Sequence, residues 1–303
     1  MPDIWDSIII GAGPAGLTAG IYLSRLGFKV LILDAGKAGG RLRSAGLIEN
    51  YPGFPEGIEG STLADRFVEH ARRFKADIRE YEEVTALQLD TSPKIIATRR
   101  GSIYQGYTII LAIGAPRRTY SIDGEERLLG RGVSYCAVCD GPLYYGRDVA
   151  ILGSGIEAIE DAQLLSRFAS RVYILASKPS RELREAKFQD NVKVYEDVEV
   201  EGIIGGDRVE SVRFRYMDRV IDLPVSAVFI ALGVLPPSKL LRSTSIELTP
   251  EGFIKVDSKC NTRVEGVYAA GDCVGLGFQI AIAVGQAATA ALSALEYLRK
   301  LKG

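Results

Sequence analysis

The chain has 303 residues, and its 37 Lys and Arg residues against 38 Asp and Glu residues leave a formal net charge of -1 at pH 7. This balance excludes the global basic field that drives nucleic-acid binding, and no apolar run reaches the length of a membrane span. The length predicts two domains, each able to bury its own core, and four cysteines are too few for a disulfide scaffold. We therefore expect a soluble protein of a reducing compartment, the cytoplasm, with no nucleic-acid and no membrane partner.

The first predicted element is a buried strand at residues 8–10, which leads through a glycine-rich turn into a helix. The residues of this turn match a dinucleotide-binding βαβ unit: Gly11, Gly13, Pro14, Ala15 and Gly16. The first glycine permits the turn, the second lets the backbone approach a pyrophosphate, and the third allows close packing of helix on strand. The phosphates would lie at the helix N-terminus, where free N–H groups and the positive end of the dipole favour anions. After a second strand at residues 30–33, Asp34 is placed to accept hydrogen bonds from an adenosine ribose.

A helix at residues 61–76 and three short strands are predicted next. The helix has apolar residues at helical spacing, with Ser61 as its candidate N-cap and His70 on its polar surface. We interpret His70 as a surface residue rather than a catalytic one. The strands are expected at residues 84–89, 94–98 and 108–113.

Two thiols one turn apart follow at Cys136 and Cys139, with the carboxylate of Asp140 beside them. A Cys-x-x-Cys pair can close a disulfide with little backbone movement, which suits it to redox chemistry. The same spacing forms half of many zinc sites, but a structural zinc site needs two further Cys or His ligands. The residues left to supply them are Cys260, Cys273 and His70. We therefore favour a redox pair over a metal site or a purely structural pair, and interpret the other two cysteines as buried or incidental thiols.

A second copy of the glycine motif follows the cysteine pair. It contains Gly153 and Gly155, with Ala158 in place of the third glycine, and its helix again returns to an apolar strand, at residues 172–175. Two copies in strand–turn–helix context are strong evidence for dinucleotide binding, whereas a single motif is weak evidence. The strands that follow should repeat the plan of the first half, at residues 198–204, 209–216 and 225–232.

The copies differ where nucleotide specificity is decided. Ala176 stands where the first copy has Asp34, and Ser177 and Lys178 follow it. Loss of the carboxylate removes repulsion against a 2′-phosphate, which Ser177 and Lys178 could bind without the bidentate grip of an arginine. The alternative, that residues 178–184 form a solvated loop and helix start, is equally open at this point.

The last predicted element is an alanine-rich helix at residues 280–301, whose apolar face should dock against a large surface. No linker rich in Pro, Gly and Ser separates the two copies. The expected crossings between them are at residues 114–116 and 232–237, which would insert the second unit into the first.

The order of these motifs, with Gly39-Gly40, Glu49-Asn50-Tyr51-Pro52-Gly53 and Gly271-Asp272, resembles the low-molecular-weight thioredoxin reductases over essentially the whole chain. The resemblance implies an α/β fold of two Rossmann-like three-layer dinucleotide-binding domains, the second inserted into the first. Residues 1–115 and 248–303 would form an FAD domain, and residues 116–247 an NAD(P)H-binding-like domain that carries the cysteine pair. The FAD contacts carried over, besides the first glycine turn and Asp34, are Gly40, Arg41, Asn50, Val84, Gly114, Gly271, Asp272 and Gln279. Members of the family are homodimers.

The resemblance also implies a route for electrons, from a donor to FAD, to the disulfide of Cys136 and Cys139, and to the disulfide of thioredoxin or a glutaredoxin-like protein. Cys139 would face the flavin, Cys136 would attack the partner, and Asp140 would act as the acid and base. For Asp140 a helix cap or a turn residue is the alternative, because it precedes Gly141 and a proline. Because a disulfide stacked on flavin is shielded from a protein substrate, the family rotates one domain against the other.

Three departures from the family pattern bear on the donor. Ala176-Ser177-Lys178 and Glu182 replace a His-Arg-Arg sequence and a further Arg, so the usual 2′-phosphate clamp is missing. Arg41 replaces a Gln, and Phe278 replaces an Arg. NADPH is the donor we expect, ahead of NADH, because no acidic residue occupies position 176. Ferredoxin and reduced deazaflavin are the rival donors.

The same core is compatible with other activities. A dithiol oxidase and a reductase that feeds a peroxiredoxin share the cysteine pair, and a non-enzymatic flavin-binding redox sensor is the third alternative. Ferredoxin–NADP reductases of this fold lack the cysteine pair, so Cys136 and Cys139 argue against that class.

Overall fold

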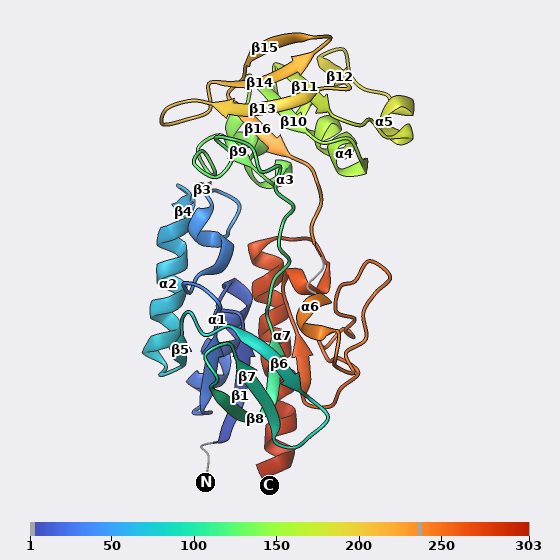
Figure 1. The fold of residues 1–303 in the computed structure, drawn as a ribbon. Helices are drawn as coiled ribbons and strands as arrows, with labels where there is room; N and C mark the ends of the chain where they lie inside the picture. Colours follow the sequence, from blue (N-terminus) through green and yellow to red (C-terminus); the bar gives the residue numbers. More distant parts are fainter. Residues whose placement is uncertain (1–3, 236–237, 303) are drawn as a thin grey trace. The chain divides into compact units, whose positions relative to one another are not determined.

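The computed structural model describes residues 4–235 and 238–302 and divides into two compact units (Figure 1). The first unit contains Met1–Arg43, Tyr51–Pro116 and Pro236–Gly303, and the second contains Ser44–Asn50 and Arg117–Leu235. The long segment Arg117–Leu235 therefore begins and ends at the crossings expected from the sequence, residues 114–116 and 232–237. Two parts of the expected division differ. Residues 238–247, assigned by the sequence to the second domain, cluster with the first unit, because Leu241 and Ile246 are buried in its core. Ser44–Asn50, assigned to the first domain, cluster with the second unit.

The first unit is built on a sheet in which parallel strands are extended by an antiparallel hairpin. The strand order is β5-β2-β1-β8-β7-β6, and β17 pairs with the end of β8. The strands are β1 (Ile4–Ile10), β2 (Val30–Leu33), β5 (Asp77–Arg79), β6 (Val84–Gln88), β7 (Lys94–Thr98), β8 (Ile103–Leu111) and β17 (Val267–Ala269). β8 is longer than predicted, since residues 103–106 pair antiparallel with β7, while residues 105–111 pair parallel with β1 and residues 109–111 with β17.

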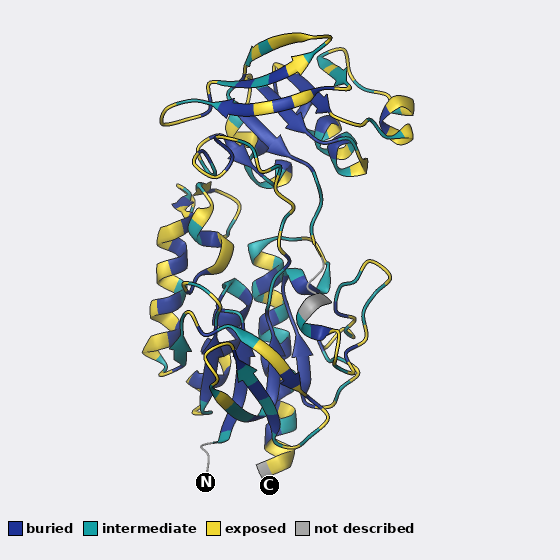
Figure 2. Cartoon of the chain, in the orientation of Figure 1, coloured by how far each residue is buried: buried dark blue, intermediate teal, exposed yellow. Residues whose placement is uncertain are grey.

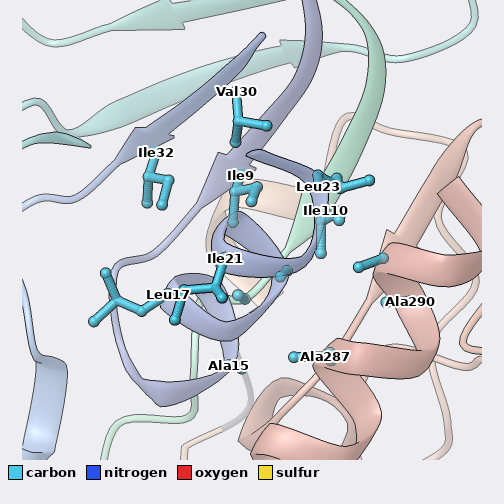
Figure 3. Packing of buried hydrophobic residues seen from close by; sticks show 14 of the residues in the cluster. Ile9, Ala15, Leu17, Ile21, Leu23, Val30, Ile32, Ile110, Ala287 and Ala290 are labelled. Carbon is cyan, nitrogen blue, oxygen red and sulfur yellow. The ribbon is translucent and has the colours of Figure 1, made fainter. Parts of the chain in front are cut away.

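Three long helices belong to the first unit: α1 (Pro14–Arg25), α2 (Gly60–Arg73) and α7 (Ile280–Lys302). By length and composition alone, α7 is long and apolar enough to span a membrane. This differs from the expectation that no apolar run in the sequence reaches that length. The alanines of α7, however, pack into the core with α1, where Ala287 and Ala290 share one buried cluster with Ala15 (Figure 3). The predicted N-cap of α2 was wrong, because the helix begins at Gly60 with Glu59 as N-cap.

The second unit repeats the parallel plan with a separate antiparallel sheet. Its parallel sheet has the order β12-β11-β10-β16-β9, and its antiparallel sheet the order β13-β14-β15. The strands are β9 (Val133–Ser134), β10 (Asp148–Leu152), β11 (Arg171–Ala176), β12 (Val192–Glu196), β13 (Glu199–Ile204), β14 (Ser211–Tyr216), β15 (Arg219–Pro224) and β16 (Ala227–Ile230). The sequence did not predict β15, because this strand has no buried residue to set an apolar period.

The remaining elements are short. They are η1 (Gly40–Ser44), β3 (Leu47–Ile48), β4 (Ile58–Glu59), α3 (Ala137–Asp140), η2 (Gly141–Tyr144), α4 (Ile156–Leu165), α5 (Arg181–Glu185), α6 (Ser238–Leu241) and η3 (Asp272–Val274). In both units the central parallel strands are buried, as Figure 2 shows in dark blue, so their carboxyl ends present loops from a rigid base.

Candidate functional site

The first glycine turn, residues 11–16, follows β1 in the first unit. Gly11 has φ +102°, and a Cβ atom there would lie 2.2 Å from the Ala112 carbonyl oxygen. At Gly16, in the first turn of α1, a Cβ would lie 1.8 Å from the Gly11 carbonyl oxygen, so this close approach of the helix to the turn requires a glycine. Gly13 is different: its φ of -77° suits any residue, and a Cβ there would meet no atom within 4 Å. Packing therefore explains Gly11 and Gly16, whereas Gly13 leaves open space in front of the helix N-terminus.

Asp34, at the end of β2, orients this turn. Its carboxylate accepts the Ala12 N–H at 2.6 Å and the Gly36 N–H at 2.8 Å. The Asp34 carbonyl oxygen in turn accepts the Glu82 N–H at 2.7 Å, which brings the segment before β6 and Val84 to the same edge. The structure thus places Asp34 beside the turn, where the sequence predicted a ribose acceptor.

Three further segments meet the first glycine turn. Gly40 approaches Gly13 so closely that a Cβ on Gly40 would lie 3.0 Å from the Gly13 Cα. Arg41 forms an ion pair with Asp272, and its Nη1 donates to the Ala115 carbonyl oxygen at 3.4 Å. The third of these segments contains Gly271 and Asp272, and a hydrogen bond from the Gly271 N–H to Gln286 Oε1 on α7, at 2.8 Å, holds it in place. The sequence missed Gln286, since a glutamine inside an alanine-rich helix carries no motif.

These segments fit an adenine dinucleotide flavin by their backbone. Gly13 and Gly114 are the two glycines here at which a side chain would enter open space. α1 has no side-chain N-cap hydrogen bond and no acidic residue in its first turn, so its N-terminus is left for an external anion. Gln279 immediately precedes α7, and Asn50 belongs to a segment that clusters with the second unit, so their flavin contacts stay predictions.

Cys136 and Cys139 form a disulfide in the second unit, with their Cα atoms 5.3 Å apart. Cys136 is the N-cap of the short helix α3, and its Sγ accepts the Cys139 N–H at 3.1 Å. Val138 between them is 61% exposed, so this turn reaches the surface of the unit. A donor aimed at the Cys136 sulfur would stabilise negative charge on that atom when the disulfide opens.

Asp140 is held by Ser134, a residue that the sequence did not single out. The Ser134 hydroxyl donates to Asp140 Oδ2 at 2.6 Å and accepts the Cys136 N–H at 3.0 Å. Burial raises the pKa of the Asp140 carboxyl above its usual value, and the Ser134 hydrogen bond lowers it in part. Asp140 occupies the N-cap position of η2 without a side-chain cap hydrogen bond, and its role as acid and base stays a prediction.

The other two cysteines have no such surroundings. Cys260 and Cys273 are buried free thiols, as expected. Burial raises the pKa of Cys260 to about 11 and that of Cys273 to about 12, so both stay protonated and unreactive near neutral pH. Among the described residues no group of three or more His, Cys, Asp and Glu is placed to hold a metal ion.

The second glycine turn, residues 153–158, follows β10. A Cβ on Gly153 would lie 2.4 Å from the Ala231 carbonyl oxygen, whereas one on Gly155 would meet nothing within 4 Å, and Ala158 is fully buried. The backbone therefore reproduces the first turn. Its surroundings differ through Glu157, which accepts the Gly233 N–H at 2.5 Å and an N–H of Arg117 at 3.1 Å.

The residues predicted to bind a 2′-phosphate lie on a solvated surface. The Ser177 hydroxyl is hydrogen-bonded to the hydroxyl of Tyr120, and Lys178 is exposed. The two nearby arginines of α5 are used in surface ion pairs, Arg181 with Glu185 and Arg184 with Glu196. The segment has the conformation of a loop and a helix start, and the binding of a 2′-phosphate by Ser177 and Lys178 stays a prediction.

Comparison with known proteins extends these observations. The family model described as pyridine nucleotide-disulphide oxidoreductase matches residues 5–291. A thioredoxin reductase of Mycolicibacterium smegmatis is 39% identical over 308 residues, with 97% of each chain covered. The structure of a thioredoxin reductase from Streptococcus pyogenes has a TM-score of 0.92 and 33% identity, with 99% of this chain and 100% of that chain covered. A ferredoxin-flavin thioredoxin reductase from Clostridium acetobutylicum has a TM-score of 0.55 and 32% identity, with 99% of each chain covered.

Proposed function

Because the chain belongs to the pyridine nucleotide-disulphide oxidoreductase family, we propose that it is a thioredoxin reductase that uses FAD and the Cys136–Cys139 disulfide. The observation that carries the proposal is the disulfide itself, with a carboxylic acid and its hydroxyl partner on the same turn. A structural disulfide has no use for the half-buried acid next to it. A disulfide that opens and closes needs such an acid, because each cycle takes up and releases protons.

FAD would be held by the first glycine turn, Asp34, and the segments of Gly40, Gly114 and Asp272. Bound there, it supplies a two-electron centre that can pass a pair of electrons to a disulfide. The open space at Gly13 and the uncapped N-terminus of α1 support this assignment. The exchange of Gln for Arg41 adds a cation at the site, and its ion pair keeps Asp272 in place.

The chain's own groups divide the disulfide chemistry between them. An electron pair, which bound FAD would supply, breaks the sulfur–sulfur bond and leaves a thiolate on each cysteine, and the Cys139 N–H already points to the sulfur of Cys136. Asp140, with its raised pKa, gives the Cys136 thiolate a proton and later takes it back. Cys136 then attacks the partner disulfide, and Cys139 closes the ring again by displacing the partner as a dithiol.

The partner disulfide, by analogy with the relatives, belongs to thioredoxin or a glutaredoxin-like protein. The relatives named thioredoxin reductase support this choice. We also expect a homodimer in the cytoplasm, in line with the family and with a thiol chemistry that suits a reducing compartment.

The electron donor is the part of the proposal with two candidates. NADPH follows from the family pattern and from intact glycines at positions 153 and 155. Ferredoxin or a reduced deazaflavin is favoured by a specific observation, the absence of an arginine clamp around Ser177 and Lys178. The ferredoxin-flavin thioredoxin reductase among the similar structures is consistent with this second candidate.

The test of the proposed function avoids the donor. Enzyme whose flavin has been photoreduced without oxygen is mixed with oxidised thioredoxin, and the thiols that form are counted. Wild-type protein should form two thiols per reduced flavin, while Cys136→Ser and Cys139→Ser should form none. Cys260→Ser, which alters a buried free thiol, should behave like wild type.

Other outcomes separate the alternatives. A Cys136→Ser protein that still reduces thioredoxin would refute the proposal. Oxygen uptake with small dithiols in the absence of thioredoxin would identify a dithiol oxidase. Bound FAD with no turnover from any electron source would indicate a redox sensor.

A further inference from the structure

The two glycine turns provide an internal comparison, because the chain folds both in the same way. Gly11 lies against the carbonyl oxygen of Ala112, at the end of β8, and Gly153 against that of Ala231, at the end of β16. In both units the strand behind the turn pairs parallel with that neighbour, Ile10 with Leu111 and Leu152 with Ile230. Each residue of the first turn therefore has a counterpart in the second turn, and the two turns can be compared position by position.

One position of the superposed turns carries opposite chemistry. Where the first turn has Ala15, a small buried residue, the second has Glu157 in the first turn of α4. The Glu157 side chain is 33% exposed, but its carboxylate is bound by groups of the same unit. Its two oxygens are each bound, one by the Gly233 N–H at 2.5 Å and the other by Arg117 at 3.1 Å, and the Arg117 side chain is only 14% exposed.

The neighbouring strand shows the same contrast. Gly114 and Gly233 both stand three residues after the paired strand ends, at Leu111 and Ile230, and both have positive φ. Facing Gly114 there is open space, while the atom facing Gly233 is Glu157 Oε2, 3.9 Å from where a Cβ would be. In a doubly wound sheet, a dinucleotide binds at the carboxyl ends of the strands, where the connections of two neighbouring strands go to opposite faces of the sheet. In the second unit, the carboxylate of Glu157 lies at this position.

The charges around α4 add to this occupation. Glu160 and Asp161 follow Glu157 on the same helix, whereas α1 has no acidic residue in its first turn. Burial, and to a lesser degree repulsion from Glu157, raise the pKa of Asp161 to about 7, although Arg117 acts in the opposite direction. A pyrophosphate would bring two more negative charges beside these carboxylates, and Arg117 is already paired with Glu157.

From this geometry we propose that Glu157 closes the second glycine turn to nicotinamide dinucleotides, by placing its own carboxylate against Gly233, where the counterpart Gly114 of the first unit faces open space. The inference deepens the proposed function and rests on it, because it concerns how electrons reach the same enzyme. It makes the second unit a carrier of the cysteine pair only. Electrons then come from a donor that does not bind at this turn.

Direct binding tests the inference without activity. Titration calorimetry of the FAD-loaded protein with NADP+ and NADPH should show no saturable binding below about 1 mM, the upper end of ordinary KM values. Glu157→Ser and Glu157→Gln should both bind NADPH at least about tenfold more tightly, because each removes one like charge a few ångströms from the phosphates. Glu157→Gln keeps a group that can accept the Gly233 N–H, so it serves if the serine variant folds poorly.

Glu160→Gln is the matched control, since it removes the same charge from an exposed position of α4 without touching Arg117 or Gly233. It should leave NADPH binding as weak as in wild type. Micromolar binding of NADPH to the wild-type protein, or equal gains in the Glu160 and Glu157 variants, would overturn the inference. The photoreduction assay reports on thioredoxin reduction separately, so a failure here leaves that result intact.

Discussion

At the scale of single residues, Ser134 is the side chain that links the two halves of the redox turn. Its hydroxyl binds the carboxylate of Asp140 and the backbone N–H of Cys136 at the same time. Ser134 is itself buried, so neither bond competes with water. We infer that it is a positioning residue, which holds Asp140 near the sulfur that Asp140 protonates and limits how far burial raises the pKa of the acid.

Ser134→Ala tests this assignment through the pH profile of thioredoxin reduction. The hydroxyl favours the ionised carboxylate, so its loss should raise the pKa of Asp140 and move the limbs of the profile that Asp140 controls to higher pH. A hydrogen bond of about 1 kcal/mol corresponds to a shift of somewhat less than one pH unit. Ser134→Thr, which keeps the hydroxyl, should restore the wild-type profile. A lower rate with unmoved limbs would indicate a purely structural role.

At the scale of elements, α4 differs from α1 although both start from the same glycine turn. α1 has no acidic residue in its first turn, while α4 concentrates Glu157, Glu160 and Asp161. Of these, Asp161 is buried most unfavourably, with a pKa of about 7. The negative charge of Asp161 therefore lowers the stability of the folded protein by an amount that depends on pH.

The sign of this cost follows from linkage. An unfolded Asp has a pKa of about 3.9, so between about pH 4 and 7 the folded state binds more protons at Asp161 than the unfolded state. Stability contributed by this group is full below pH 4 and falls as the pH rises to about 7. Asp161→Asn should therefore raise the melting temperature at pH 8 relative to wild type, and change it little at pH 4. Asp218→Asn changes an exposed turn residue, so the melting temperature of this variant should differ from that of wild type by the same amount at every pH.

At the scale of the whole molecule, one structural plan occurs twice, and the two copies have diverged in use. Gly13 and its counterpart Gly155 both face open space, but Gly114 faces open space whereas its counterpart Gly233 faces the carboxylate of Glu157. Each unit has its own buried clusters, so each is expected to fold around its own core. FAD should then stabilise the first unit alone, by mass action on its folded state.

A pair of valine substitutions tests this division. Gly13 and Gly155 both have extended backbone angles and open Cβ positions, so valine at either site should leave the fold intact. Gly13→Val should weaken FAD binding by about tenfold or more and shrink the difference in melting temperature between the FAD-bound and FAD-free protein. Gly155→Val should change neither quantity. Equal loss of FAD in both variants would show that the two turns are not used differently.

The sequence by itself determined the elements that rest on local pattern. The buried strands, both glycine turns, the redox pair and the alanine-rich last helix were all predictable, because each has a short-range signal in spacing or period. Exposed β15 and the first half of β8 were missed, since pairing with a neighbour, and not an apolar period, makes them strands.

Tertiary structure decided what the repeated motifs face. Ser134 on β9 meets Asp140 at the end of α3, and Glu157 meets Gly233 and Arg117 across 76 and 40 residues of sequence. No spacing rule relates such residues, because the sheet brings together strands that are far apart in the chain. The sequence shows two dinucleotide turns of equal quality, and the side chains that converge on each turn distinguish the one that leaves room for an anion from the one that already holds its own.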